Sequence, residues 1–279
     1  MCPKKLSQNE RNGTHMKRIK QFLVIFILFV IMFSISLPIF AEEKEEEAFD
    51  IPDHVLKIAK ENTYPNSAED QEVVEPSQLT KQLIDDVDTS IENPELIKVL
   101  NETSLSPSPI GIGYRGMVYL GRWALSYHSL DTTVNWEYQQ VNSNELNNVD
   151  GDKEQIFHYN QQEEKKIEGA LTNKISKPED VKKMMLLKAK EKTKLPLSYE
   201  TVIGKNTKKD HPYKVPVKKQ GYLHAYAPAV NEKGQVTFGE VYIQLKGTKK
   251  SLVIKNVTKQ GIGAWIPIQD YLSVYLQLK

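Results

Sequence analysis

Histidines are the side chains best suited to acid–base or metal chemistry in this chain, and their spacing limits what they can do. Five of the six lie beyond residue 50, at His54, His128, His158, His211 and His224. No two stand four residues apart, the spacing with which a helix presents a histidine pair to zinc. The single cysteine, Cys2, lies ahead of an apolar run, so we expect no disulfide, thiolate nucleophile or cysteine-based zinc site. We therefore predict no metal, no cofactor and no catalytic residue from these side chains.

Two strings match ligand-binding motifs only in part. Gly111-Ile-Gly113-Tyr-Arg-Gly116 has the G-x-G-x-x-G pattern, but it follows two prolines and runs into a strand-like segment. A dinucleotide site needs a strand before the pattern and a helix after it. Oxygen-bearing residues alternate over 148–154 like the opening of a calcium loop, but Tyr159 stands where the closing glutamate belongs. We interpret the first string as strand glycines and the second as a polar Asx-type turn.

Acid–base catalysis is not indicated by the remaining candidates. His224 lies in Tyr222-Leu-His-Ala-Tyr-Ala-Pro, where a hydrogen-bonded sheet histidine is a commoner role than a general base. A glycosidase needs two carboxylates in a sugar-binding cleft. Beyond residue 41 the chain has 35 acidic side chains, the 36 of the whole chain less Glu10, and their spacing selects no pair.

The N-terminal segment has the features of an export signal. A basic stretch, Met16-Lys17-Arg18-Ile19-Lys20, precedes an uninterrupted apolar run, Phe22 to Phe33. Pro38 then breaks the helix, and Ala41 followed by Glu42 forms an acceptable cleavage site. The alternative is an uncleaved anchor, because residues 22–41 are long enough to span a bilayer. Either form places the protein outside the cytoplasm, secreted or tethered to the outer face of the cytoplasmic membrane.

Composition divides the chain into four segments. They are 1–41, a signal peptide or anchor with Met16 as the expected start; 42–50, an acidic spacer; 51–109, a helical N-terminal region; and 110–279, a β-rich domain with a helix at about 178–192. In the helical region Ser77 and Asn93-Pro94 are typical helix starts. The later helix follows Ser176-Lys-Pro-Glu179, which we interpret as a capping box.

Residue patterns of the β-rich domain favour an antiparallel sheet. Segments rich in β-branched and aromatic residues are expected as separate strands, at 114–120, 123–127, 133–141, 155–159, 222–227, 236–246, 252–257, 264–268 and 271–278. The order of helices, strands, one helix and strands again predicts an α+β fold, with a sandwich-like or barrel-like sheet and one inserted amphipathic helix.

Charge is distributed unevenly along the chain. Residues 42–100 have seventeen acidic side chains against five lysines, whereas residues 174–219 have fourteen lysines against five acidic side chains. The predicted helix therefore has a basic face, formed by Lys182, Lys183, Lys188, Lys190, Lys192 and Lys194. Such a face could bind anionic envelope polymers or lipid head groups. The alternative is a solvated surface that partly docks against the chain's own acidic region.

Four stretches resemble the YfkD-like family of exported proteins of Bacillus-type Gram-positive bacteria. They are residues 132–138, 195–204, 221–234 and 260–270, which read TTVNWEY, LPLSYETVIG, GYLHAYAPAVNEKG and QGIGAWIPIQD. The resemblance covers about Ile51 to the C-terminus. It implies no assigned activity, and it carries over no catalytic residue.

Taken together, these features predict a cell-envelope protein that is a non-enzymatic binding or structural module. The alternative is a hydrolase of the wall or of a polysaccharide, using paired carboxylates. No nucleic-acid partner is expected, because the segment after residue 41 has a net charge near −4, from 31 basic and 35 acidic side chains. A deep cleft with two close carboxylates would favour the hydrolase. A flat sheet surface lined by aromatic residues would favour binding.

Overall fold

The computed structural model describes residues 49–58, 63–64, 73–107 and 113–279. The predicted leader, its processing residues Ala41 and Glu42, and nearly all of the acidic spacer lie outside these ranges.

A long antiparallel sheet organises the structure, with β9 (Lys219–Lys246) as its central strand. One edge of β9 pairs along its whole length with β3 (Arg115–Asn148). The other edge pairs first with β11 (Tyr271–Leu278) and then with β10 (Lys249–Pro267). Two short strands extend the sheet, β1 (Val55–Lys57) beside β11 and β6 (Ala170–Leu171) beside β10. Most of β9 is therefore hydrogen-bonded on both edges.

The long strands continue through stretches where breaks between strands were predicted. The register of β3 against β9 shifts at five points, one of them at Gly121, whose φ is 112°. Two of these shifts, at Gly121 and between Ser129 and Asp131, fall where breaks were predicted, and such bulges bend a strand without ending it. Residues 231–234 likewise remain in β9, because β3 and β10 pair with them on both sides. Gly234 is needed there, since a Cβ would lie 2.3 Å from the carbonyl oxygen of His128.

Two helices lie between β1 and β3 in the chain, and both begin where the sequence predicts. Ser77 caps α2 (Gln78–Asp85), its hydroxyl accepting a hydrogen bond from the Thr80 amide at 3.2 Å. Asn93 caps α3 (Pro94–Glu102), its side-chain oxygen accepting from the Glu95 amide at 2.9 Å. Each cap satisfies an amide that the first helical turn leaves free.

The inserted helix is α4 (Pro178–Thr193), and its predicted capping box is wrong. Lys177, in the left-handed conformation at φ 54°, is the N-cap residue, and its side chain makes no capping hydrogen bond. Pro178 instead fixes the first helical φ, and Glu179 and Asp180 place negative charge near the positive end of the helix dipole.

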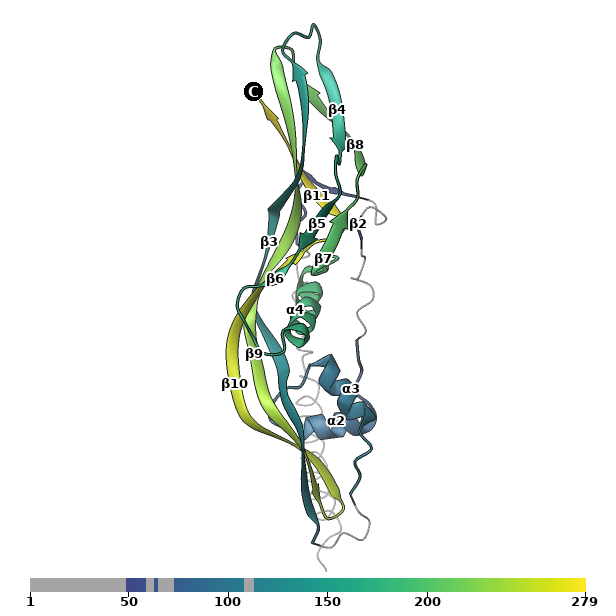
Figure 1. Ribbon diagram of the computed structural model, residues 1–279, viewed down its shortest axis with the longest axis vertical. Helices are drawn as coiled ribbons and strands as arrows, with labels where there is room; N and C mark the ends of the chain where they lie inside the picture. The colour runs from purple at the N-terminus through teal and green to yellow at the C-terminus, as the bar shows by residue number, and fades with distance from the viewer. Residues whose placement is uncertain (1–48, 59–62, 65–72, 108–112) are drawn as a thin grey trace, which may run out of the picture. The chain divides into compact units, whose positions relative to one another are not determined.

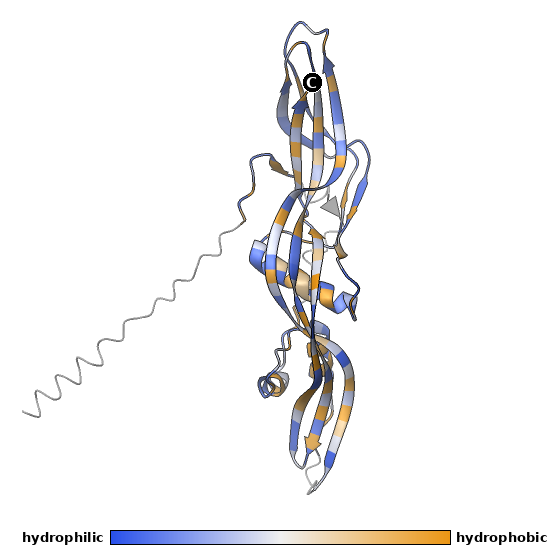
Figure 2. Cartoon of the chain, turned by 90° about the vertical axis from the view of Figure 1, so that its left-hand side faces the viewer, coloured by the Kyte–Doolittle hydropathy of each residue, from blue (hydrophilic) through white to orange (hydrophobic). Residues whose placement is uncertain are grey.

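The helices and two smaller sheets cover one face of the long sheet, which we call the inner face (Figure 1). The smaller sheets consist of β2 (Thr63–Tyr64), β7 (Glu200–Ile203) and β5 (Lys165–Glu168), and of β4 (Gln155–Asn160) and β8 (Lys208–Val215). Figure 2 shows the opposite, outer face, with the long strands in front of the helices. None of the described helices or smaller sheets lies on that face.

Three hydrophobic clusters hold the covering elements to the inner face. One joins α2 and α3 to the hairpin end of β9 and β10, one joins α4 to the middle of the sheet, and one joins β4, β5 and β7 to β11 and the start of β9. The predicted α+β class, antiparallel pairing and inserted helix are confirmed. Among the described residues, no helix is both long and apolar enough to cross a membrane.

Candidate functional site

Five aromatic side chains gather on the outer face, where β3, β9, β11 and β1 lie side by side. They are Tyr222, His224 and Tyr226 of β9, Tyr275 of β11, and His54 directly before β1. Successive side chains of a strand point to opposite faces. Leu223 and Ala225, between the rings of β9, are accordingly buried in the inner face, whereas all five rings are half-buried. We call these five residues the aromatic face.

The rings of the aromatic face contact one another across strands. Tyr275 stands opposite His224 in the register, and its ring centroid lies 4.5 Å from that of His54 and 6.1 Å from that of Tyr226. Tyr222 and His224 have nearly parallel rings, 6.3 Å apart between centroids. The Tyr275 hydroxyl oxygen also lies 2.6 Å from His54 Nε2. These contacts hold the five rings as one continuous surface.

Hydrogen-bond contacts hold both ring nitrogens of His224. Its Nδ1 lies 3.2 Å from Ser143 Oγ and 3.3 Å from Gln140 Nε2, and its Nε2 lies 3.3 Å from Gln277 Oε1. His224 is therefore a hydrogen-bonded sheet histidine, as its sequence context predicts.

Charged side chains that contact the aromatic face come in both signs. Lys279 Nζ lies 4.8 Å from the centroid of the Tyr222 ring, and Glu145 of β3 stands opposite Tyr222. Burial raises the pKa of Tyr275, and a hydrogen bond with Glu137 adds to the rise. The aromatic face thus has charged neighbours of both signs at its edge, whereas the hydrogen-bond partners of His224 are uncharged.

A buried carboxylate lies on the inner face, beneath α4. Glu232 of β9 is fully buried and accepts hydrogen bonds from the Tyr127 hydroxyl at 2.8 Å and from Thr132 Oγ1 at 2.6 Å. Ser129 Oγ lies 3.3 Å from Thr132 Oγ1 and accepts from Lys192 Nζ at 2.8 Å. Burial, followed by the charge of Glu232, raises the pKa of Tyr127. Two hydroxyl groups therefore connect an ammonium group of α4 to the carboxylate.

This network has the residue types of a serine–lysine nucleophile but not its arrangement. The ammonium group of Lys192 donates and Ser129 accepts, so none of these described contacts gives Ser129 a base that could take its proton. A buried carboxylate is costly unless hydrogen bonds satisfy it. The network supplies those bonds to Glu232, and we assign it a structural role.

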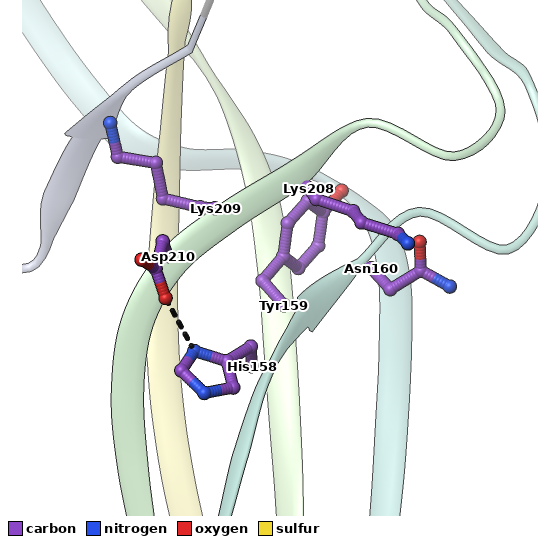
Figure 3. A pocket seen from close by; sticks show the side chains of 6 residues that line it. All are labelled: His158, Tyr159, Asn160, Lys208, Lys209 and Asp210. Carbon is purple, nitrogen blue, oxygen red and sulfur yellow. Dashed lines mark ion pairs between the residues drawn. The ribbon is translucent and has the colours of Figure 1, made fainter.

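A hollow of about 510 Å³ opens between β4 and β8 and is lined by charged and polar side chains. Figure 3 shows His158 and Asp210 pointing toward each other, with Nδ1 and Oδ1 3.4 Å apart, while Lys208 extends toward Asn160. Lys209 donates to the carbonyl oxygen of Lys57 at 2.7 Å. The hollow therefore offers one carboxylate, Asp210, rather than the pair that a glycosidase requires.

The lysines of the predicted basic face lie on α4 and at its C-terminal end. Lys183 donates to Glu95 of α3 at 2.5 Å, and within the helix Lys182 and Lys188 pair with Glu179 and Glu191, at 3.1 and 3.5 Å respectively. Lys192 contacts Ser129, as described above, and burial lowers the pKa of Lys190. The remaining member, Lys194, is the C-cap residue, with φ 57°. Docking against the chain's own acidic residues thus accounts for part of this surface, and binding of anionic polymers by it stays a prediction.

The calcium-like string at 148–154 is a tight turn. The side-chain Nδ2 of Asn148 donates to the carbonyl oxygens of Lys153 at 3.0 Å and Val215 at 2.9 Å, which ties the turn to the end of β8. The Val149 amide donates to the side-chain oxygen of Asn147 at 3.0 Å, an Asx-type contact. Within the ranges that the structure describes, no three His, Cys, Asp or Glu side chains are grouped as metal ligands.

The sequence indicates His224 as a sheet histidine but does not predict the aromatic face. The alternation in Tyr222-Leu-His-Ala-Tyr indicates three rings on one side of a strand. Tyr275 and His54 join them through pairing of β11 with β9 and of β1 with β11, over long separations in the chain. Local spacing contains no signal for such contacts. The sequence likewise does not distinguish Glu232 from the other acidic residues, because its contact with Tyr127 depends on the pairing of β3 with β9.

Comparison with known proteins agrees with the resemblance noted in the sequence. A family model described as YfkD-like protein matches residues 52–279. A Bacillus subtilis (strain 168) protein named "Uncharacterized protein YfkD" is 51% identical over 263 residues, which span 94% of this chain and 98% of that protein. No solved structure matches the chain significantly. The chain belongs to the YfkD-like family.

Proposed function

We propose that the protein acts outside the cytoplasm as a non-enzymatic binding module of the cell envelope, with the aromatic face as its contact surface. The export-like segment at 16–41 supports the location. The observation that carries the binding role is the cluster of five half-buried rings on a sheet face that no described helix or smaller sheet covers.

Tyrosine and histidine rings suit such a surface energetically. A tyrosine offers a large apolar ring and a polar tip while losing the freedom of only two side-chain torsions. At roughly 25 cal/mol per Å², covering about 100 Å² of this surface contributes about 2.5 kcal/mol. The hydrogen bonds of His224 and Tyr275 already order the rings, which lowers the entropic cost of binding.

The hydrolase alternative has less support. It requires two carboxylates that face a common cleft. Asp210 lies beside His158 in the hollow, and Glu232 is buried among hydroxyl groups. Neither carboxylate has a second one as partner in these contacts.

Sedimentation with isolated cell walls tests the binding role. We expect the purified protein to co-sediment with walls, and the double variant Tyr222→Ala/Tyr226→Ala to lose affinity at least about tenfold. Tyr119→Ala is the matched control, because Tyr119 is an exposed tyrosine that contacts Tyr242 at the hairpin end of the sheet. Equal retention of the double variant and the wild type would show that the aromatic face is not the contact surface.

Protease treatment of intact cells tests the location. We expect external protease to degrade the protein without lysis, and a variant lacking residues 1–41 to be protected inside the cell. N-terminal sequencing then distinguishes a cleaved form beginning at or near Glu42 from an anchored form that keeps the leader. Full protection of the wild-type chain would contradict export.

A further inference from the structure

We infer that the aromatic face binds an uncharged glycan, a chain of linked pyranose rings. The inference rests on the proposed function and names its ligand class. Its basis is the chemistry of the polar groups among the rings. The three side chains that hydrogen-bond the ring of His224, namely Gln140, Ser143 and Gln277, are uncharged.

Charge complementarity favours an uncharged ligand. A polyanion would bring negative charge toward Glu137 and Glu145, whereas a polycation would bring positive charge toward Lys279. Around His224, the groups that contact the imidazole offer no opposite charge to either polymer. Desolvating a charge without a partner is expensive, so a neutral polymer is the better match to this surface.

The surface also matches the two kinds of group that a sugar presents. A pyranose ring has a face of C–H groups and a rim of hydroxyl groups. The C–H face packs on aromatic rings, whose faces are electron-rich. The hydroxyl groups both donate and accept, as the amides of Gln140 and Gln277 and the hydroxyl of Ser143 do. A peptide strand would instead add to a sheet edge through its backbone, whereas the aromatic face lies on the flat of the sheet.

The spacing of the rings suits a polymer rather than a single sugar. Alternate residues of a strand lie about 7 Å apart, and the centroids of Tyr222 and His224 are 6.3 Å apart. Tyr226 continues the row, and Tyr275 and His54 widen it across β11. Successive rings can therefore contact successive units of one chain.

Calorimetric titration with chitohexaose and with cellohexaose, two soluble uncharged oligosaccharides, tests the inference. We expect at least one of them to bind, with an affinity that changes less than about twofold between low and high salt, because an uncharged ligand is not screened. Tyr222→Ala and Tyr226→Ala should each weaken binding at least about tenfold. Tyr226→Phe, which keeps the ring, should stay within about threefold of wild type, and Tyr119→Ala should be unchanged. Circular dichroism confirms that each variant is folded.

The wall-sedimentation experiment separates failure of this inference from failure of the proposed function. One outcome is that walls retain the protein through the aromatic face while neither oligosaccharide binds at millimolar concentration. In that case the ligand is not an uncharged glycan, and the binding role stands. An uncharged glycan is equally excluded if polyphosphate competes for wall retention and high salt abolishes it. If retention does not depend on Tyr222 and Tyr226, both the inference and the contact surface are wrong.

Discussion

Residues 222–227 of β9 present two different surfaces from one short stretch of chain. Leu223, Ala225 and Ala227 point to the inner face and are at most 2% exposed. Tyr222, His224 and Tyr226 point to the outer face and are half-buried. The inner residues join a cluster with Ile167 of β5 and Ile203 of β7, whereas no described helix or smaller sheet covers the outer ones.

The difference separates stability from recognition along a single strand. On the inner face, two small alanines let the smaller sheets approach closely, and burial of aliphatic groups stabilises the fold. On the outer face, large rings are retained although no covering layer needs them. Substitutions on the two faces should therefore affect different measurements.

The largest expected effect on stability comes from removing buried volume on the inner face. Leu223→Ala should lower the free energy of unfolding by about 2–5 kcal/mol, because it leaves a cavity in a fully buried cluster. Tyr222→Ala, one residue away on the outer face, should cost less than half as much. Urea unfolding of both variants provides the measurement. Equal losses would mean that the outer rings are as much a part of the core as Leu223.

Two glutamates of β9 allow the same residue type to be compared on the inner and the outer face. Glu232 on the inner face and Glu240 on the outer face each accept two hydrogen bonds, the latter from the Tyr242 hydroxyl at 2.8 Å and Asn256 Nδ2 at 2.9 Å. Glu232→Ala should lower the free energy of unfolding by about 1–3 kcal/mol, because Tyr127 and Thr132 lose their acceptor in a buried site.

The matched variant Glu240→Ala should have a much smaller effect, since water can replace the lost carboxylate there. Both variants are measured by urea unfolding at neutral pH. A small loss for Glu232→Ala would show that the network beneath α4 is dispensable, and the structural role assigned to it would be wrong.

Alkaline pH should destabilise the inner face through Tyr199. Burial, followed by the charge of Glu232, raises the pKa of Tyr199, and its hydroxyl has no hydrogen-bond partner among the described residues. The unfolded chain releases the tyrosine proton above about pH 10, while the folded chain keeps it. The stability present below that pH is therefore lost as the pH rises further, by up to about 1.4 kcal/mol per pH unit for one such group.

The variant Tyr199→Phe isolates this contribution. It removes a buried hydroxyl that has no partner, so stability at neutral pH should change little. Above pH 10 the free energy of unfolding of the variant should fall less steeply with pH than that of the wild type. The two slopes should differ by the contribution of about one titrating group. Urea unfolding at several pH values gives both slopes, and parallel slopes would exclude Tyr199 as a source of the alkaline sensitivity.

The sequence predicted the features that depend on residues close together in the chain, such as the starts of α2 and α3. Asn93 and Ser77 start their helices because a side chain at that position satisfies a free amide close by. The prediction at Ser176 failed because Lys177 adopts a left-handed conformation and Pro178 begins α4 without a side-chain cap. Antiparallel pairing and the inserted helix followed from the order of patterns, and both are confirmed.

What the sequence could not predict depends on partners far along the chain. Residues 231–234 have the composition of a turn, yet they stay extended because β3 and β10 bind both edges of β9. The aromatic face likewise depends on contacts between residues that are far apart in the chain. The alternation on β9 indicates Tyr222, His224 and Tyr226, but Tyr275 and His54 reach them only through the strand order β1–β11–β9.

The smallest expected effect comes from the ion pair between α3 and α4. Lys183 Nζ and Glu95 Oε1 lie 2.5 Å apart, but the two side chains are 49% and 42% exposed, and exposed pairs contribute between about 0 and 1 kcal/mol. The hydrogen bond and charge of Lys183 lower the pKa of Glu95 below 4.5. The ion pair therefore stabilises the protein above pH 4.5, and this stabilisation is lost as the pH falls through the lowered pKa of Glu95.

A double-mutant cycle with Lys183→Met and Glu95→Gln should give a small coupling energy at pH 7 that disappears in acid. The control is the pair of Lys182 and Glu179, which lies within α4 and joins no two elements. A coupling energy that persists at low pH would mean that the two side chains interact through packing rather than charge. The contact between α3 and α4 would then stabilise the protein in the same way as the buried contacts of the inner face.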